Sequence, residues 1–297
     1  MFTSMHESTP HQQPSPPPTM AFPAPHIHQP EGTHTHTIVL LHGRGSNGPE
    51  FAEELFSSST SNGQNLASRL PNYRWVFPTS RDRWSTTFQE EMSAWFDVYS
   101  LTDIQQRREL QKEGLCESIL QILEILETEI ELLNGQVSRL YLGGMSQGMA
   151  TALWVFLAAM VTSRVQGPLG GLLGFCGWLP FAHQLEDRLD KATAAPGAPQ
   201  IGHLIRELFL DEIAGDETFR TEKEVDISLL STPVFLSHGA DDAWVSVELG
   251  QQAFRVFQTM MSRVEWNEHT GAENDGHWIK EPEGFDQIVQ FLESTSI

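Results

Sequence analysis

Short runs of apolar residues alternate along the chain with longer stretches in which apolar positions recur every three or four residues. The first run, residues 37–41, reads Thr-Ile-Val-Leu-Leu and passes directly into His-Gly-Arg-Gly. This is typical of a buried parallel strand followed by a turn. The same pattern predicts further strands at residues 73–78, 137–142, 169–175, 233–237 and 263–268.

Helices are predicted between these strands. In residues 102–134 the apolar positions fall on one helix face and charged residues cover the other; they are Leu115, Ile119, Ile122, Leu123, Leu126 and Ile130. Further helices are expected at residues 149–160, 246–260 and 282–295. Strands that alternate with helices predict an α/β fold, a mostly parallel sheet with helices on both faces.

Two segments depart from this alternation. Residues 1–33 are rich in Pro, His, Gln, Ser and Thr, which favours a disordered, flexible tail ahead of a folded domain at residues 34–297. The alternating His26, His28, His34 and His36 have no Cys or carboxylate partner in the pattern, so no metal is expected there. Residues 181–232 contain a Pro/Ala/Gly break and a predicted helix at 201–213, and form either a surface excursion or a partial cover of an active site.

Composition narrows the class of protein. With 297 residues, 39% hydrophobic content and eight Trp, the chain has enough apolar surface for one domain plus the tail. A formal charge of −21 disfavours nucleic acid and anionic lipid as partners. Cys116 and Cys176, both expected as buried thiols, are too few for a disulfide framework. The absence of a secretory pattern and of an apolar run of about 20 residues predicts a cytoplasmic protein without stable membrane insertion.

The candidate nucleophile is Ser146, in the sequence Gly144-Met145-Ser146-Gln147-Gly148. A Gly-x-Ser-x-Gly motif alone is weak evidence, but this one lies between a predicted strand and a predicted helix. There, a sharp turn needs small residues two positions before and after the serine, and the turn lifts the hydroxyl above the sheet edge.

A serine hydroxyl needs a histidine to take its proton and an acid to orient that histidine. On this type of fold the three follow the chain order Ser, acid, His. Asp241 and Asp242 follow the strand at 233–237, and both remain candidates for the acid. His269 and His277 follow the last strand; His277 is favoured because it follows a flexible Gly and precedes the last helix.

The oxyanion of an acyl-transfer reaction needs two N–H donors, one from the residue after the nucleophile and one from the loop after an early strand. Gln147 and Arg44 hold these positions and would act through their backbone amides, leaving their side chains free to vary. Four tryptophans lie near predicted strand ends: Trp84, Trp178, Trp244 and Trp278. They either line a groove for an acyl chain or pack in the core.

Over residues 37–295 the chain resembles the acyl-protein thioesterase, or phospholipase/carboxylesterase, family of α/β-hydrolases. The likeness rests on ordered elements: His42 to Gly45, Trp95-Phe96-Asp97, Gly144 to Gly148, and Cys176-Gly177-Trp178-Leu179-Pro180. It implies the α/β-hydrolase fold and a triad of Ser146, Asp242 and His277, the acid being identified by the family's His-Gly-x-x-Asp segment. No metal or organic cofactor is implied.

The resemblance implies a carboxylic ester or thioester hydrolase acting through an acyl-enzyme, with S-acylated protein as one candidate substrate. A lysophospholipase or short-chain carboxylesterase is the alternative, and a non-catalytic binding protein is a further one. The chain departs from the family at Arg44, where many members have Leu, and at Ala240 and Ala243, where many have Asp and Pro. These departures bear on the substrate; the sequence does not define the oligomeric state.

Overall fold

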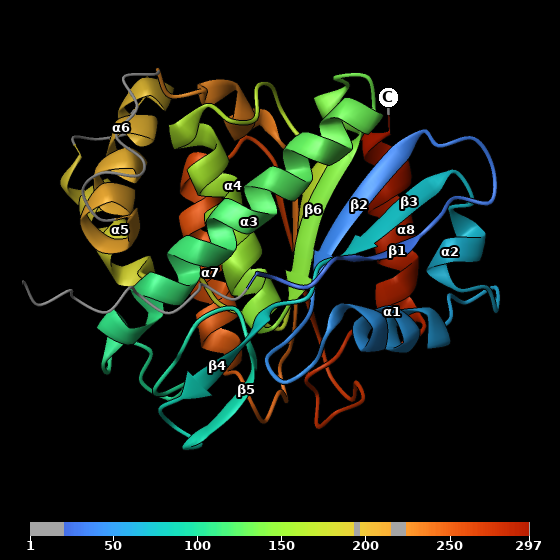
Figure 1. Ribbon diagram of the computed structural model, residues 1–297, viewed down its shortest axis with the longest axis horizontal. Helices are drawn as coiled ribbons and strands as arrows, with labels where there is room; N and C mark the ends of the chain where they lie inside the picture. The colour runs from blue at the N-terminus through green and yellow to red at the C-terminus, as the bar shows by residue number, and fades with distance from the viewer. Residues whose placement is uncertain (1–20, 193–196, 215–223, 297) are drawn as a thin grey trace, which may run out of the picture.

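A seven-stranded sheet forms the centre of the computed structural model, which describes residues 21–192, 197–214 and 224–296 (Figure 1). The strand order is β1-β3-β2-β6-β7-β8-β9. All neighbouring pairs are parallel except β1 with β3. The strands are β1 (His26–His28), β2 (His36–Leu41), β3 (Tyr73–Phe77), β6 (Leu140–Met145), β7 (Gly171–Phe175), β8 (Val234–Gly239) and β9 (Val264–His269).

The six strands expected from the apolar runs are all present. Every residue of β6, β7 and β8 is buried, which explains why these strands read as continuous apolar runs rather than alternating ones. β6 begins later than predicted because residues Val137–Arg139 form a short 3-10 turn before the strand.

Helices cover both faces of the sheet and enclose two hydrophobic cores, as predicted. On one face lie α3 (Gln111–Leu132), α4 (Gln147–Thr162) and α7 (Val247–Met260). On the other lie α1 (Gly48–Ser57), α2 (Leu66–Arg69) and α8 (Glu283–Thr295) (Figure 1). All of α4 is buried, between the sheet and an outer layer of helices. None of the helices in the described residues is both long and apolar enough to cross a membrane.

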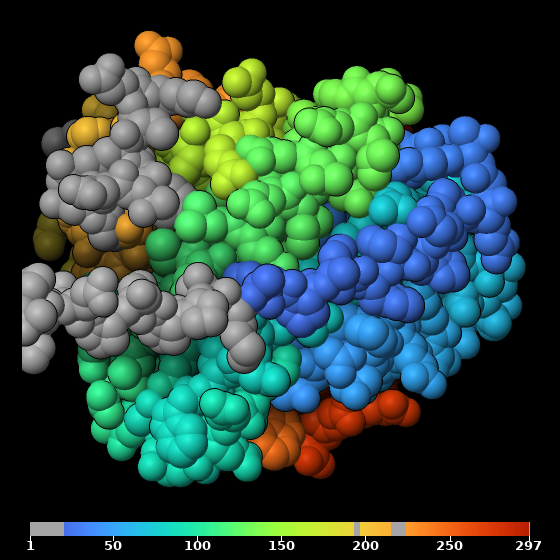
Figure 2. Space-filling view, in the orientation of Figure 1, coloured from blue at the N-terminus to red at the C-terminus, as the bar shows by residue number. Residues whose placement is uncertain are grey.

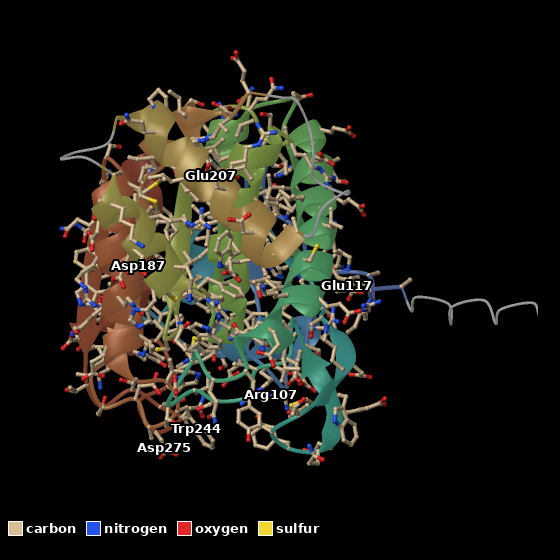
Figure 3. The ribbon with its side chains drawn as sticks, turned by 90° about the vertical axis from the view of Figure 1, so that its left-hand side faces the viewer. Arg107, Glu117, Asp187, Glu207, Trp244 and Asp275 are labelled. Atoms are coloured by element: carbon tan, nitrogen blue, oxygen red, sulfur yellow. The ribbon has the colours of Figure 1, made fainter. Side chains whose placement is uncertain are left out.

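The outer layer comes from the segment that interrupts the predicted alternation. It contains α5 (Ala182–Lys191), α6 (Ala198–Phe209) and a π-helical turn at Leu210–Ala214. α6 packs on α4, where Phe209 stacks on Trp154 at 6.2 Å between ring centroids. Figure 3 shows Glu207 of α6 far from the end of the molecule at which Trp244 and Asp275 lie. The described part of residues 181–232 is therefore a helical layer on the core.

The predicted end of the tail at residue 33 was wrong, because residues 26–28 form β1. Ile27 pairs with Val76 of β3, and the His28 ring lies 5.0 Å from that of Phe56. In Figure 2 the dark blue N-terminal segment lies along the surface beside α3. Composition does not reveal such a strand, because a three-residue pairing that covers the outer edge of β3 needs little apolar surface. Residues 1–20 lie outside the described residues.

A separate two-stranded hairpin, β4 (Arg81–Ser85) and β5 (Glu90–Ala94), projects beyond the sheet. Its strands are largely polar, and only Ser85 and Ala94 are buried, so the hydrophobic pattern did not predict them. The hairpin is tied to the loop after β2, since the Gly45 amide donates to the Ser93 carbonyl at 2.8 Å. Of the two cysteines, Cys176 is buried as expected, whereas Cys116 is only partly buried; both are free thiols.

Candidate active site

Ser146 occupies a sharp turn between β6 and α4. Its φ of 56° lies in the left-handed region, which non-glycine residues seldom adopt. A Cβ at Gly144 would lie 2.4 Å from the Gly148 carbonyl carbon, and one at Gly148 would lie 2.1 Å from the Leu41 oxygen. The turn closes against β2 only with glycine at both positions, as the sequence motif predicted.

Asp242 and His277 form a hydrogen-bonded pair from two neighbouring loops. His277 Nδ1 donates to Asp242 Oδ2 at 2.7 Å, and the Asp242 side chain is fully buried. Asp242 Oδ1 accepts from the amides of Trp244 and Val245, each at 2.9 Å. Burial alone would raise the pKa of Asp242, but hydrogen bonds from His238 and His277 outweigh it and hold this pKa well below its usual range. Asp242 is therefore a carboxylate at neutral pH.

His238 is a second histidine on Asp242, which the sequence reasoning missed. Its Nε2 lies 2.9 Å from the Val245 carbonyl oxygen and 3.2 Å from Asp242 Oδ2. Both neighbours are acceptors, so Nε2 carries the hydrogen. A Cβ at Gly250 would lie 2.3 Å from His238 Nδ1, which shows how closely α7 approaches the ring. The signal was the His of the His-Gly-x-x-Asp segment, which the sequence reasoning used only to locate the acid.

Removing the His238 donor is expected to slow turnover. We expect His238→Leu to lower kcat about tenfold, because Val245 loses its partner and Asp242 is held by one donor fewer. His238→Gln keeps an N–H at a similar reach and is expected to retain most of the activity. The check is kcat with p-nitrophenyl butyrate for both variants; equal kcat values would contradict this role.

The rival candidates support the loop that carries His277. Asp241 Oδ2 accepts from the Gly271 amide at 2.8 Å. His269 Nε2 lies 3.0 Å from the Trp278 carbonyl oxygen. Neither is among the described residues that line the cavity around Ser146. Their contacts hold the start and the end of the loop between β9 and α8.

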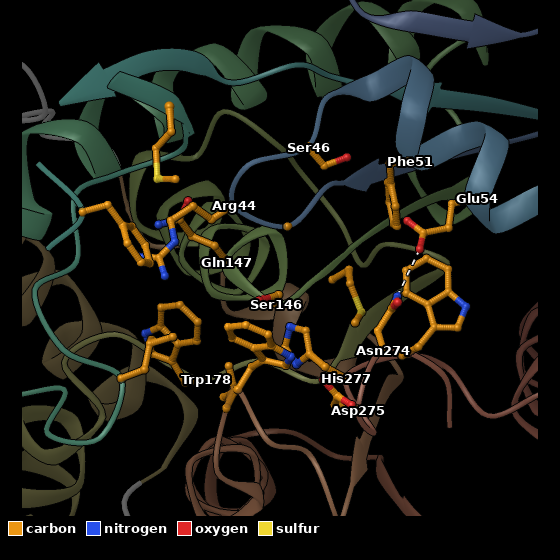
Figure 4. Close-up of a pocket in the computed structure, with 18 residues that line it drawn as sticks. Arg44, Ser46, Phe51, Glu54, Ser146, Gln147, Trp178, Asn274, Asp275 and His277 are labelled. Atoms are coloured by element: carbon orange, nitrogen blue, oxygen red, sulfur yellow. Dashed lines mark hydrogen bonds between the residues drawn. The ribbon is translucent and has the colours of Figure 1, made fainter. Parts of the chain in front are cut away.

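His277 is presented by a tightly wound turn. Asn274, Asp275 and Gly276 have successive φ values of 53°, 55° and 82°. The His277 amide donates to the Asn274 carbonyl at 3.0 Å, and Asn274 Nδ2 donates to Glu54 Oε1 at 3.1 Å (Figure 4). The turn is thus joined to α1 at the wall of the cavity, which Asn274 and Glu54 both line.

The cavity has a volume of about 470 Å³ and contains Ser146, Gln147 and His277. Three of the four Trp residues considered for an acyl groove, Trp178, Trp244 and Trp278, also line it. The prediction was wrong for Trp84, which is 54% exposed on the hairpin and not among the described lining residues. Sequence position near a strand end does not reveal which side of a hairpin faces a cavity. Described residues of 181–232 do not line it either.

The expectation that the Gln147 side chain is free to vary was also wrong. Its Oε1 accepts from the Trp95 amide at 2.9 Å, and its Nε2 donates to the Phe96 carbonyl at 2.8 Å. Trp95 Nε1 in turn donates to the His42 carbonyl at 2.8 Å. This network joins the Ser146 turn to the loop that carries Arg44, so the two backbone amides proposed for the oxyanion are held relative to each other.

His42 fixes the same loop with its ring. Nδ1 donates to the Gly43 carbonyl at 2.7 Å, and Nε2 accepts from the Ser80 amide at 3.0 Å. Burial lowers the pKa of His42 to about 4. The folded protein therefore holds this ring neutral at pH values where an exposed histidine takes up a proton.

The buried neutral His42 predicts acid sensitivity of the fold. Its folded pKa of about 4 is below the unfolded value of 6.5, so its stabilisation is present above pH 6.5 and is lost as the pH falls toward 4. We expect His42 to contribute about 2 kcal/mol to this loss between pH 7 and pH 4.5. Urea unfolding at pH 7 and pH 4.5 measures it, with the exposed His203→Gln as control. His42→Gln should reduce the pH dependence; an unchanged dependence would contradict the assignment.

The mostly parallel sheet and the strained serine turn after β6 place the chain in the α/β-hydrolase class. The sequence model of the phospholipase/carboxylesterase family matches residues 23–198, and the chain belongs to this family. It is an ester or thioester hydrolase.

Relatives and solved structures agree with this membership. The chain is 23% identical over 265 residues to Acyl-protein thioesterase 1 of Yarrowia lipolytica, covering 88% of this chain and 91% of the relative. It is 26% identical over 274 residues to Acyl-protein thioesterase 1 of Gibberella zeae, covering 91% and 94%. The crystal structure of Zea mays acyl-protein thioesterase 2 is similar with a TM-score of 0.62 and 25% identity, covering 91% of this chain and 98% of that one.

Proposed function

We propose that the chain hydrolyses carboxylic esters and thioesters, with Ser146 as nucleophile, His277 as general base and Asp242 as the acid that orients it. The observation that carries this proposal is the 2.7 Å hydrogen bond between His277 and the buried Asp242, at the cavity that also contains Ser146. Figure 4 shows Ser146 and His277 next to each other in the middle of that cavity.

In the first step, His277 Nε2 takes the proton of Ser146 as the serine oxygen attacks the acyl carbonyl carbon. Because Nδ1 donates to Asp242, the Nε2 atom of the neutral ring is free to accept that proton. The amides of Arg44 and Gln147 stabilise the oxyanion of the tetrahedral intermediate. The protonated His277 then donates to the leaving alcohol or thiol, and an acyl-serine remains.

In the second step, His277 removes a proton from water, which attacks the acyl-serine carbonyl. Collapse of this second intermediate releases the carboxylic acid and restores the Ser146 hydroxyl. Asp242 stays ionised throughout and stabilises the imidazolium that forms in both steps, in keeping with its depressed pKa.

Within this chemistry, we favour the thioester of an S-acylated protein as the substrate. The similarity to this chain covers more than nine-tenths of the relatives in Yarrowia lipolytica and Gibberella zeae, and both relatives are named acyl-protein thioesterase. The cavity is bounded by apolar side chains that suit an acyl chain, among them Phe88, Met92 and Leu101. A lysophospholipid or a short-chain ester is the alternative substrate.

Labelling by a fluorophosphonate serine probe tests the nucleophile. We expect the wild-type protein to be labelled, and Ser146→Ala to be neither labelled nor active, a loss of at least about a thousandfold in kcat. Ser68→Ala is the matched control, because Ser68 is exposed on α2 away from the cavity. It should be labelled like the wild type.

Turnover then identifies the substrate. p-Nitrophenyl esters, acyl-thioesters and lysophosphatidylcholine with acyl chains of two to sixteen carbons distinguish the three substrate classes. Folded wild-type protein that takes up no probe and hydrolyses none of these would contradict the proposal and favour a non-catalytic binding protein.

A further inference from the structure

Arg44 places a guanidinium in the cavity beside Ser146. Its Cζ lies 4.7 Å from the centroid of the Phe88 ring, and both residues line the cavity. In the described part of the chain, no hydrogen bond or ion pair engages this guanidinium. Burial lowers the pKa of Arg44 and the charge of Asp97 opposes this shift, but an arginine in such a site remains charged. Arg44 therefore offers a fork of charged donors to whatever occupies the cavity.

Other partly buried arginines of this chain are paired. Arg74 donates to Glu129 at 2.9 Å and Arg164 to Glu127 at 2.7 Å, and Arg83 lies 2.8 Å from Glu117. With 39 acidic residues against 18 basic ones, carboxylates are in excess. A shortage of acids therefore does not explain why Arg44 has no carboxylate partner among the described residues.

Asp97, whose charge acts on Arg44, and Glu54 on the cavity wall are both engaged elsewhere. Asp97 accepts from the amide and the hydroxyl of Thr86. Glu54 accepts from Asn274, and in Figure 4 this pair lies on the opposite side of Ser146 from Arg44. Asp275 lines the cavity as well. The cavity consequently has a cationic side at Arg44 and an acidic side at Glu54.

Packing on Phe88 leaves the hydrogen-bond donors of Arg44 available. A cation–π contact contributes about 0.5–1 kcal/mol at an exposed site, and none of the guanidinium nitrogens is among the buried, unpaired side-chain atoms of the described residues. A carboxylate or phosphate group would satisfy two of these donors at once, in the fork geometry that guanidinium favours.

We propose that Arg44 binds an anionic group, a carboxylate or a phosphate, on the acyl chain of the substrate. This inference rests on the proposed ester and thioester hydrolase function, and it concerns the acyl group alone, whether the leaving group is an alcohol or the thiol of a protein. Phe88 packs on the guanidinium, and Trp178 lies on the same side of Ser146 (Figure 4), so the methylenes of an acyl chain have apolar contacts there. Glu54 on the other side repels an anion. Because an extended arginine side chain spans roughly 6 Å, the anion lies about four to six bonds from the scissile carbonyl.

The test compares an anionic and a neutral substrate of similar length. The substrates are p-nitrophenyl hemiglutarate and p-nitrophenyl hexanoate, each measured with wild type and with Arg44→Leu. We expect the ratio of their kcat/KM values to fall about 10- to 100-fold in Arg44→Leu. Using the ratio within each protein cancels any general effect of the substitution on the site.

Arg255→Gln is the control for overall charge. Arg255 is exposed on α7, so this substitution removes the same positive charge away from the cavity. Its ratio should equal that of the wild type. Arg44→Lys keeps the charge without the fork and should give an intermediate ratio.

A third substrate, 5-hexanoyloxy-2-nitrobenzoate, carries the anion on the leaving group. If Arg44→Leu changes the ratio only for this ester, the placement on the acyl chain is wrong. An unchanged ratio for both anionic esters, with p-nitrophenyl hexanoate still hydrolysed, overturns the anion site and leaves the proposed function standing.

Binding to the Ser146→Ala protein tests the anion site without turnover. Monomethyl glutarate titrated by calorimetry should bind, and the additional Arg44→Leu substitution should weaken this binding about 10- to 100-fold. Equal binding by the two proteins overturns the inference, even if the wild type hydrolyses none of the esters.

Discussion

Asp242→Asn is expected to lower kcat about 10,000-fold while the protein stays folded. The amide oxygen of the asparagine can still accept from the Trp244 and Val245 amides. Its NH₂ group then replaces Oδ2, where it faces His277 Nδ1 and His238 Nε2. To avoid two facing donors, His277 must turn Nδ1 into an acceptor, which places its hydrogen on Nε2. That tautomer is unable to take the Ser146 proton.

Asp241→Asn is the matched control, because it removes the same charge one residue earlier. Asp241 holds the Gly271 amide rather than a ring, so we expect a loss in kcat of less than about tenfold. Steady-state hydrolysis of p-nitrophenyl butyrate measures both variants, and near-ultraviolet circular dichroism checks their packing. Asp242→Asn protein with more than a tenth of wild-type kcat would show that Asp242 is not the acid.

Gly148→Ala is expected to lower the free energy of unfolding by about 3 kcal/mol or more and to abolish turnover. The added methyl group would meet main-chain oxygens, 2.1 Å from that of Leu41 and 2.6 Å from that of His42. Main chain in the middle of a sheet cannot move aside as a side chain can. Either β2 and α4 separate, or the Ser146 turn changes shape.

The control for this substitution is Gly197→Ala. Gly197 precedes α6 with a φ of −66°, and a Cβ there comes no nearer than 3.9 Å to any described atom beyond its neighbours. Urea unfolding and kcat should both stay close to wild type for this control. Wild-type stability for Gly148→Ala would disprove the close approach of the two backbones.

The sequence predicted the parts of the fold in which burial dictates composition. β6, β7 and β8 are buried on both faces, so their apolar runs are unambiguous. β1 and the β4–β5 hairpin were not predicted, since an exposed strand at an edge leaves no such run. Their position depends on hydrogen bonds to distant segments, such as that from Gly45 to Ser93.

For the candidate site too, some features could be predicted from the sequence and others could not. The hydrogen-bonded pair Asp242–His277, at the cavity that contains Ser146, agrees with the chain order and strand ends from which the proposed triad was inferred. The roles of His238 and of the Gln147 side chain were missed, because each consists of contacts to segments that are distant in sequence or folded back in a turn. The incorrect placement of Trp84 has the same origin, since the direction of a side chain on a hairpin follows from how that hairpin docks.

The hairpin lies outside the sheet that carries Ser146, yet Phe88 and Met92 from this stretch form part of the cavity wall. It is attached near its base, by the Gly45 amide and by a contact between Ser80 and Ser93 at 2.8 Å. Thr86 and Thr87 at its tip also donate to Asp97 and to the carbonyls of Val98 and Tyr99. Residues 88–92 lie between these attachments and can therefore diverge without disturbing the central sheet and its helices. Under the proposed function, substitutions at Phe88 and Met92 would therefore alter the shape of the acyl-binding cavity while Ser146, Asp242 and His277 keep their positions.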